Sequence, residues 1–220
     1  MIWRVLLAAL LAGIAAGLLM AAIQQVRITP LILEAEHYEK TGGHDHGAAQ
    51  GEAWTPAGLE RTVYTTLASV VAGGGFAALL AGISVMLAVP VTARNGILWG
   101  LAGFLAVNLA PAAGLPPELP GMPGADLLNR QIWWVATIAA TATGIGLFSL
   151  RAETSAKIAG VALIALPHLI GAPQPVDHES GVPPGLSAAF AANSLAAAAI
   201  FWCAIGGFLG LAMDRLVRRG

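Results

Sequence analysis

The chain has 220 residues, of which 57% are hydrophobic and only 10% are charged, and its net charge is −1. A typical soluble domain is roughly 25% charged, so this composition excludes an ordinary soluble protein and requires a lipid environment. The single cysteine, Cys203, excludes an intramolecular disulfide and a metal cluster held by several cysteines.

Six apolar stretches are candidates for membrane-spanning helices, because about 20 helical residues cross a hydrocarbon core of about 30 Å. In chain order they are 5–26, 63–89, 97–112, 132–150, 158–172 and 186–213. The first follows Arg4, as the core of a signal peptide would. It is longer than the roughly 7–15 residues of such a core, so we expect a retained anchor. The fifth is the shortest and could instead be a buried or re-entrant segment.

Three pairs of glycines lie one helical turn apart in or beside these stretches, namely Gly13 with Gly17, Gly96 with Gly100, and Gly206 with Gly210. Small residues at this spacing let two helices approach closely. The sequence therefore predicts close helix contacts at these positions.

The distribution of lysine and arginine indicates the orientation, because these residues accumulate in cytoplasmic loops. With six spans, one side carries Arg4, Arg94, Arg151, Lys157, Arg215, Arg218 and Arg219, and the other carries Arg27, Lys40, Arg61 and Arg130. A five-span chain would move the C-terminal basic cluster to the opposite side. We therefore predict an all-α membrane protein, a bundle of six transmembrane helices with both termini cytoplasmic. It would form one domain over residues 1–220.

The predicted outer loops are longer than the inner ones. The first, 27–62, carries histidines and acidic residues and begins with a helical extension that places Glu34 and His37 one turn apart on one face. The second, 113–131, is rich in proline, which fixes the backbone and removes hydrogen-bond donors. We expect it to form a rigid cap without a regular helix.

All five histidines and ten of the twelve acidic residues fall on the predicted outer side. Imidazole and carboxylate groups together suit zinc, nickel and cobalt, whereas no thiolate is available for copper(I). The predicted metal ligands are Glu34, His37, His44, Asp45, His46, His168 and His178. The tract at 44–46 could equally be a solvated polar loop. His168 follows Pro167 in an apolar stretch and could instead form a hydrogen bond to a neighbouring helix.

Two common motifs are missing from the sequence. It has no Gly-rich loop ending in Gly-Lys-Ser or Gly-Lys-Thr, and it has no His-Glu-x-x-His. We therefore expect neither a nucleotide site of that type nor a zinc protease, and we predict that the chain is not an enzyme. Transport would draw its energy from a partner or from an ion gradient.

Several segments are distinctive enough to indicate a family. They are Pro30-Leu-Ile-Leu-Glu-Ala-Glu36, Gly58-Leu-Glu-Arg61, Gly114-Leu-Pro-Pro-Glu-Leu-Pro-Gly-Met-Pro123, Arg130-Gln-Ile-Trp-Trp134 and Leu166-Pro-His-Leu-Ile-Gly-Ala-Pro173. With these segments nearly the whole chain resembles the CbtA family of bacterial membrane proteins, regarded as cobalt transporter subunits. The resemblance implies six helices, cobalt(II) as the transported substrate, a link to cobalamin synthesis and a small one-span partner with its own histidine motif.

We therefore expect a membrane subunit that collects cobalt(II) outside, accepts it at His168 with Glu34 or His37, and passes it inward between helices. Two alternatives stay open: a non-transporting assembly protein, and a haem-handling membrane protein with His168 as an axial ligand. No nucleic-acid partner is expected. The ligand types alone favour no one metal among cobalt, nickel and zinc, so the choice of cobalt follows from the resemblance.

Overall fold

The computed structural model of the chain describes residues 2–41, 57–176 and 179–218, and all regular structure within them is helical. The long helices are α1 (Ile2–Ile23), α2 (Thr29–Thr41), α3 (Gly58–Met86), α6 (Leu127–Leu150), α7 (Thr154–Ile170) and α8 (Pro184–Met213). Shorter helices are α4 (Gly96–Phe104) and α5 (Ala110–Ala112), and three π-helical segments are η1 (Gln24–Ile28), η2 (Leu105–Leu109) and η3 (Asp214–Arg218). The prediction of an all-α protein is confirmed for this part of the chain.

Four helical stretches are long and apolar enough to cross a membrane: Ile2–Tyr38, Gly58–Met86, Leu127–Leu150 and Pro184–Val217. Two further apolar helices, Gly96–Ala112 and Thr154–Ile170, are shorter and coincide with the third and fifth predicted spans. Large apolar side chains cover the outside of the long helices, and Leu67 and Val71 of α3, for example, are 56% and 65% exposed. These surfaces are suited to contact with lipid.

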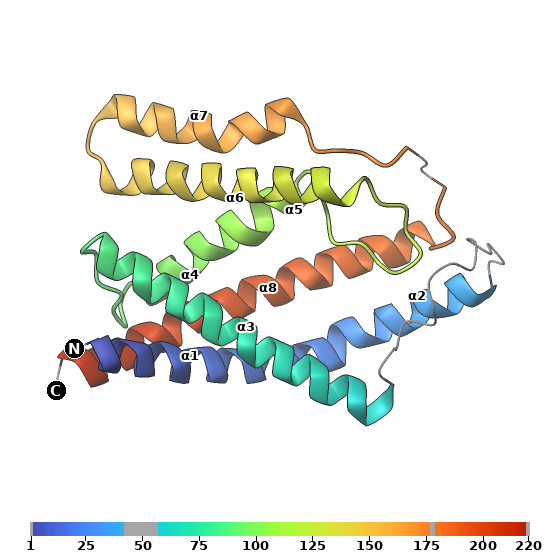
Figure 1. Cartoon of the computed structure of the whole chain (residues 1–220), viewed down its shortest axis with the longest axis horizontal. Helices are drawn as coiled ribbons and strands as arrows, with labels where there is room; N and C mark the ends of the chain where they lie inside the picture. The colour runs from blue at the N-terminus through green and yellow to red at the C-terminus, as the bar shows by residue number, and fades with distance from the viewer. Residues whose placement is uncertain (1, 42–56, 177–178, 219–220) are drawn as a thin grey trace.

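The helices form two groups (Figure 1). In one group α1 packs against α3 and α8, and α4 packs against α8 on its other side. In the other group α6 and α7 form a hairpin, which meets the first group mainly where α6 contacts η2 and α5. Both chain termini lie at the same end of the molecule, as expected for an even number of spans (Figure 1).

Glycines allow the closest helix contacts. A Cβ atom added to Gly13 of α1 would lie 2.5 Å from backbone atoms of Gly73 and Gly74 in α3. A Cβ added to Gly206 of α8 would likewise meet the carbonyl oxygen of Gly96 at the start of α4. No real Cβ fits in such a space, so the prediction of close packing at these glycines is confirmed.

The proline-rich segment between α5 and α6 contains no regular helix from residue 113 to 126, as predicted. The predicted loop extended to residue 131, but α6 already begins at Leu127, where the carboxylate of Asp126 caps the helix by accepting from the amide of Asn129 at 3.0 Å. Leu119 of this segment is 3% exposed and packs with Ala35, Val182 and Leu186. The segment is therefore fixed against α2 and the start of α8.

Candidate functional site

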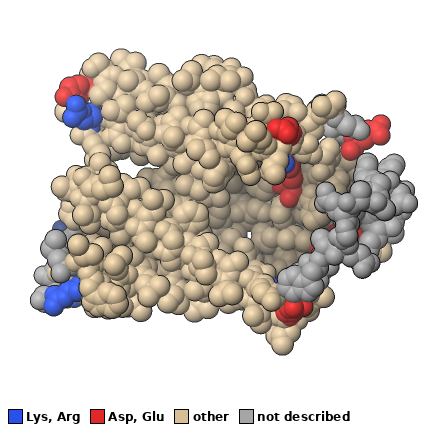
Figure 2. All heavy atoms as spheres, viewed as in Figure 1, with Lys and Arg blue, Asp and Glu red and all other residues tan. Residues whose placement is uncertain are grey.

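Charge separates the two ends of the described structure (Figure 2). The end that holds both termini carries Arg4, Arg94, Arg151, Lys157 and Arg215 against Glu153 and Asp214. The opposite end carries α2, the segment 113–126 and the start of α8, and acidic side chains predominate there. We call these the basic end and the acidic end. Almost no charge lies between them on the face shown, as expected for a surface in contact with lipid.

A cavity of about 450 Å³ lies toward the acidic end, and we call it the polar cavity. Its walls come from η2 and α5, from the proline-rich segment, from α6 and from α8, and they include Asn108, Glu118, Arg130 and Gln131. The Nη2 atom of Arg130 lies 2.7 Å from a carboxylate oxygen of Glu118, and the two side chains are 29% and 24% exposed. The cavity therefore contains a partly buried ion pair beside two amide side chains.

The π-helical turn η2 positions Asn108 in this cavity. Such turns inside α-helices frequently mark functional sites, because the extra residue rotates the following side chains. The Oδ1 atom of Asn108 accepts a hydrogen bond of 2.7 Å from Nε1 of Trp202, an indole that is 1% exposed in α8. Asn108 therefore satisfies a buried donor and also lines the polar cavity.

Two further polar contacts cross between helices near η1. The hydroxyl of Ser69 in α3 donates to Oε1 of Gln24 at 3.0 Å, and Nε of Arg27 donates to Oδ1 of Asn193 in α8 at 3.2 Å. Polar side chains inside a membrane protein often join helices in this way. We attribute a packing role to these residues.

His168 lies in the last turn of α7 and its side chain is exposed. Its ring meets the ring of Trp133 edge to face, with the centroids 5.9 Å apart. The Nε1 atom of the same indole donates to the carbonyl oxygen of Pro167 at 3.2 Å, and the amide of Gly171 donates to that oxygen at 3.0 Å. Trp133 therefore holds both the ring of His168 and the end of α7 against α6.

Glu34 and His37 are both exposed on α2. The neighbouring Glu36 forms an ion pair with Arg61 of α3 at 3.0 Å, which joins α2 to the start of α3. Helix α7 lies at the top of the view in Figure 1 and α2 at its lower right, with α8 between them, so the structure does not bring His168 together with Glu34 or His37. Among the described residues, no group of three or more His, Cys, Asp or Glu side chains is close enough to hold a metal ion.

The other predicted ligands, His44, Asp45, His46 and His178, lie outside the described residues. Their role as metal ligands stays a prediction. The sequence predicts that Glu118 and Arg130 both lie on the outer side, but it does not predict their pairing. The available signal was a carboxylate within the proline-rich segment and a guanidinium shortly after it.

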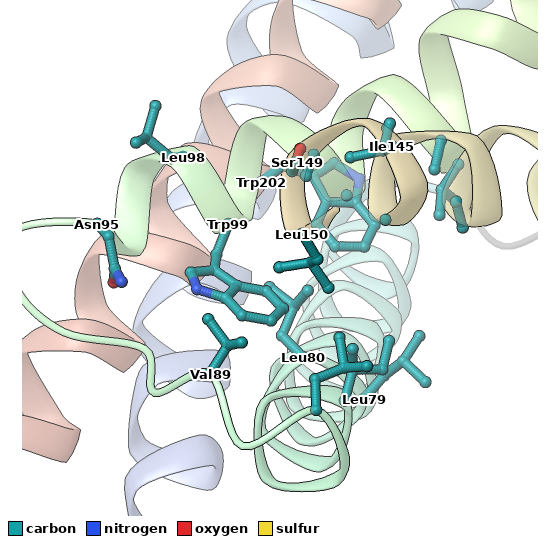
Figure 3. Close-up of a pocket in the computed structure, with 18 of the residues that line it drawn as sticks. Leu79, Leu80, Val89, Asn95, Leu98, Trp99, Ile145, Ser149, Leu150 and Trp202 are labelled. Carbon is teal, nitrogen blue, oxygen red and sulfur yellow. The ribbon is translucent and has the colours of Figure 1, made fainter. Parts of the chain in front are cut away.

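A second cavity, of about 470 Å³, lies between α3, α4 and α6, and we call it the apolar cavity. Figure 3 shows the ring of Trp99 among Val89, Leu80 and Leu150 at this site. Apart from the indoles, the polar side chains that line it are those of Asn95 and Ser149. Val107 of η2 lines both cavities, so they adjoin each other at this segment.

Comparison with known proteins identifies the family. The model of the family described as "Probable cobalt transporter subunit (CbtA)" matches residues 2–214, which is nearly the whole chain. No curated protein and no solved structure matches it. With its apolar helices and its opposed charged ends, the chain is a multi-pass membrane protein that belongs to the CbtA family of probable cobalt transporter subunits.

Proposed function

We propose that the protein is the membrane subunit of a cobalt(II) uptake transporter, which collects the ion at its acidic end and passes it inward. The match to the family over residues 2–214 is the observation that supports this most directly. The proposal includes a small one-span partner with a histidine motif and a location in the bacterial cytoplasmic membrane.

The charge distribution supports the direction of transport. Basic residues prefer the cytoplasmic side of a membrane, so the end with Arg94 and Arg151 would face the cytoplasm. The acidic end would then face outward and attract divalent cations, because a surface of one sign raises the local concentration of ions of the opposite sign. Both termini would be cytoplasmic, and the two shorter apolar helices would complete six spans.

The polar cavity is the entry site that the geometry favours. Its lining includes the carboxylate residue Glu118 and the amide residues Asn108 and Gln131, whose side chains carry oxygen atoms. Oxygen and imidazole nitrogen ligands both suit divalent cobalt. Glu118 is paired with Arg130, so an incoming cation would compete with the guanidinium for the carboxylate. The predicted ligands on the outer loops, together with His168, would deliver the ion to this cavity.

The route beyond this cavity would be unfavourable for ions in the described conformation. Past Val107 the walls belong to the apolar cavity, and a desolvated divalent ion is strongly disfavoured in such surroundings. Passage of cobalt therefore requires a movement of the α6–α7 hairpin or ligands from the partner. This agrees with a protein that acts as one subunit of a larger transporter.

Uptake of radiolabelled cobalt, nickel and zinc into cells expressing the chain, with and without the small partner, tests the proposal. We expect cobalt uptake above the vector control, and a further rise with the partner. No metal uptake in either case would favour the alternative of a non-transporting assembly protein. A haem absorption band in the purified chain would favour the haem-handling alternative.

A further inference from the structure

The apolar cavity separates the α6–α7 hairpin from the rest of the bundle toward the basic end. Figure 2 shows the molecule hollowed on this face, between the hairpin and α3. A Cβ atom added to Gly146, which lines the cavity from α6, would meet no atom within 4 Å. The space is therefore open. The side chains that line it lose van der Waals contacts unless another molecule fills it.

The walls of the cavity are those of a site for a hydrocarbon chain. Leucine, isoleucine, valine, alanine and two tryptophans make up most of the lining. Its volume of about 470 Å³ lies within the range of roughly 300–1,000 Å³ that small-molecule sites occupy. Such walls have few ligand atoms for a metal ion, but they can make apolar contacts with an acyl chain.

Polar and basic groups lie where this cavity approaches the basic end. Asn95 and Ser149 line the cavity from two different elements. The exposed Arg94 directly precedes Asn95, and the exposed Arg151 follows Ser149 by two residues. The side chain of Asn95 holds the loop before α4, accepting from the amide of Thr92 at 2.7 Å and donating to the carbonyl of Pro90 at 3.0 Å. The arrangement is therefore amphipathic, with apolar walls and a basic rim.

Two carboxylates lie close to this rim. Glu153 lies 3.8 Å from Arg151, but both side chains are more than 60% exposed, so this pair is weak and is readily exchanged. Asp214 accepts from the amide of Ala93 at 2.9 Å and thereby fixes the same loop to the end of α8. Basic residues still outnumber acidic ones at this end, so an anionic group is attracted to it.

We propose that the apolar cavity with its rim of Arg94 and Arg151 is a binding site for one anionic phospholipid. An acyl chain fills the space between α3, α4 and α6, and the phosphate and its anionic headgroup lie at the two guanidinium groups. Basic pockets between transmembrane helices on the cytoplasmic side bind anionic headgroups in this way. The lipid thereby joins the α6–α7 hairpin to the rest of the bundle.

Native mass spectrometry of the purified full chain in a non-ionic detergent tests this site. Phosphatidylglycerol and phosphatidylcholine with identical acyl chains are titrated separately. The fraction of the protein that carries one bound lipid is measured at each lipid concentration. We expect wild-type protein to bind phosphatidylglycerol preferentially. In Arg94→Gln/Arg151→Gln this preference should fall by about fivefold for each arginine neutralised, while the binding of phosphatidylcholine stays unchanged.

Two further variants separate the site from general charge and from misfolding. Gly146→Leu places a side chain in the open space, so it should reduce the binding of both lipids while thermal unfolding stays like that of the wild type. The matched charge control, Arg4→Gln/Arg215→Gln, removes two exposed arginines from other helices at the same end and should keep the preference.

Three results would overturn the proposal. They are equal binding of the two lipids by the wild-type protein, an equal loss of preference in the matched charge control, and undiminished lipid binding in Gly146→Leu. A protein dimer that Gly146→Leu abolishes would instead assign the cavity to a second copy of the chain. None of these readouts depends on cobalt transport, so the lipid site and the proposed function are tested separately.

Discussion

The guanidinium of Arg130 lies 2.7 Å from the carboxylate of Glu118, and both side chains line the polar cavity at the acidic end. The two residues come from different elements, the first turn of α6 and the proline-rich segment before it. Their contact closes this segment onto α6. In the proposed transporter the same carboxylate is the strongest cation ligand that the polar cavity offers.

Replacing Glu118 with glutamine is expected to weaken cobalt binding by about tenfold or more. One unit charge at about 4 Å from another is worth roughly 1–4 kcal/mol, depending on the effective dielectric constant. Arg130→Gln should keep or raise the affinity, because it removes the group that competes for the carboxylate. Equilibrium dialysis with radiolabelled cobalt measures both effects. Glu60→Gln, which removes an exposed carboxylate in the first turn of α3, is the control; an unchanged affinity in Glu118→Gln contradicts the prediction.

The indole of Trp133 is expected to stabilise the hairpin of α6 and α7 through its bond to the carbonyl of Pro167. Trp133→Phe keeps an aromatic ring but removes the donor, so the free energy of unfolding should fall by about 0.5–1.5 kcal/mol. Thermal unfolding in detergent measures the change. Trp3→Phe, at a position that is 74% exposed in α1, should have almost no effect. Equal losses in both variants would show that the hydrogen bond is not responsible.

The sequence predicted the helices well because their apolar length is set by the membrane. The third span was placed at 97–112, and the helical stretch runs from Gly96 to Ala112. The observed helix ends differ from the predicted span ends where a helix continues into polar residues. Helix α3 begins at Gly58 rather than at residue 63, because Glu60 and Arg61 occupy helical positions outside the apolar stretch. Helix α7 ends before residue 172, because Gly171 adopts a φ of 90° that ends the helix.

The cavities were harder to predict than the helices. The pairing of Glu118 with Arg130 depends on how a proline-rich segment folds back, and the environment of Asn108 depends on the π-helical turn of η2. Neither feature produces a periodic pattern of apolar residues from which it could be predicted. The charge asymmetry was predictable, because it follows from residue type and from the order of the spans alone. The sequence thus indicated which end would attract cations but not which side chains would meet there.

His168 is expected to be a cobalt ligand in the proposed transporter. His168→Ala should then lower cobalt uptake by about tenfold or more, since one ligand of a metal site is lost, and loss of even an outer-shell partner typically costs 10–100-fold. Gln174→Ala removes another exposed polar side chain at the same end and is the matched control. Wild-type uptake by His168→Ala would favour the non-transporting alternative.

Cobalt binding should also weaken as the pH is lowered from about 7.5 to about 5.5, because only the neutral imidazole ring binds a metal. Protons and cobalt compete for the same ring nitrogen, so the direction of the change follows from histidine ligation. Dialysis of the wild type and of His168→Ala across this range measures it. A pH dependence that is identical in the two proteins would show that His168 is not the ligand responsible.

Adjacent glycines of α8 provide the sharpest test of the fold. Gly206→Ala would drive a methyl group into the carbonyl oxygen of Gly96, so we expect the contact of α4 with α8 to loosen at a cost of about 1–3 kcal/mol. Gly207→Ala would place its methyl group 3.8 Å from a side-chain carbon of Ile97, an ordinary contact, and should be neutral or stabilising by up to about 1 kcal/mol. Thermal unfolding of the two variants compares them directly. Equal effects would mean that α4 and α8 do not approach through Gly206, whereas the expected difference assigns the close contact to one face of α8.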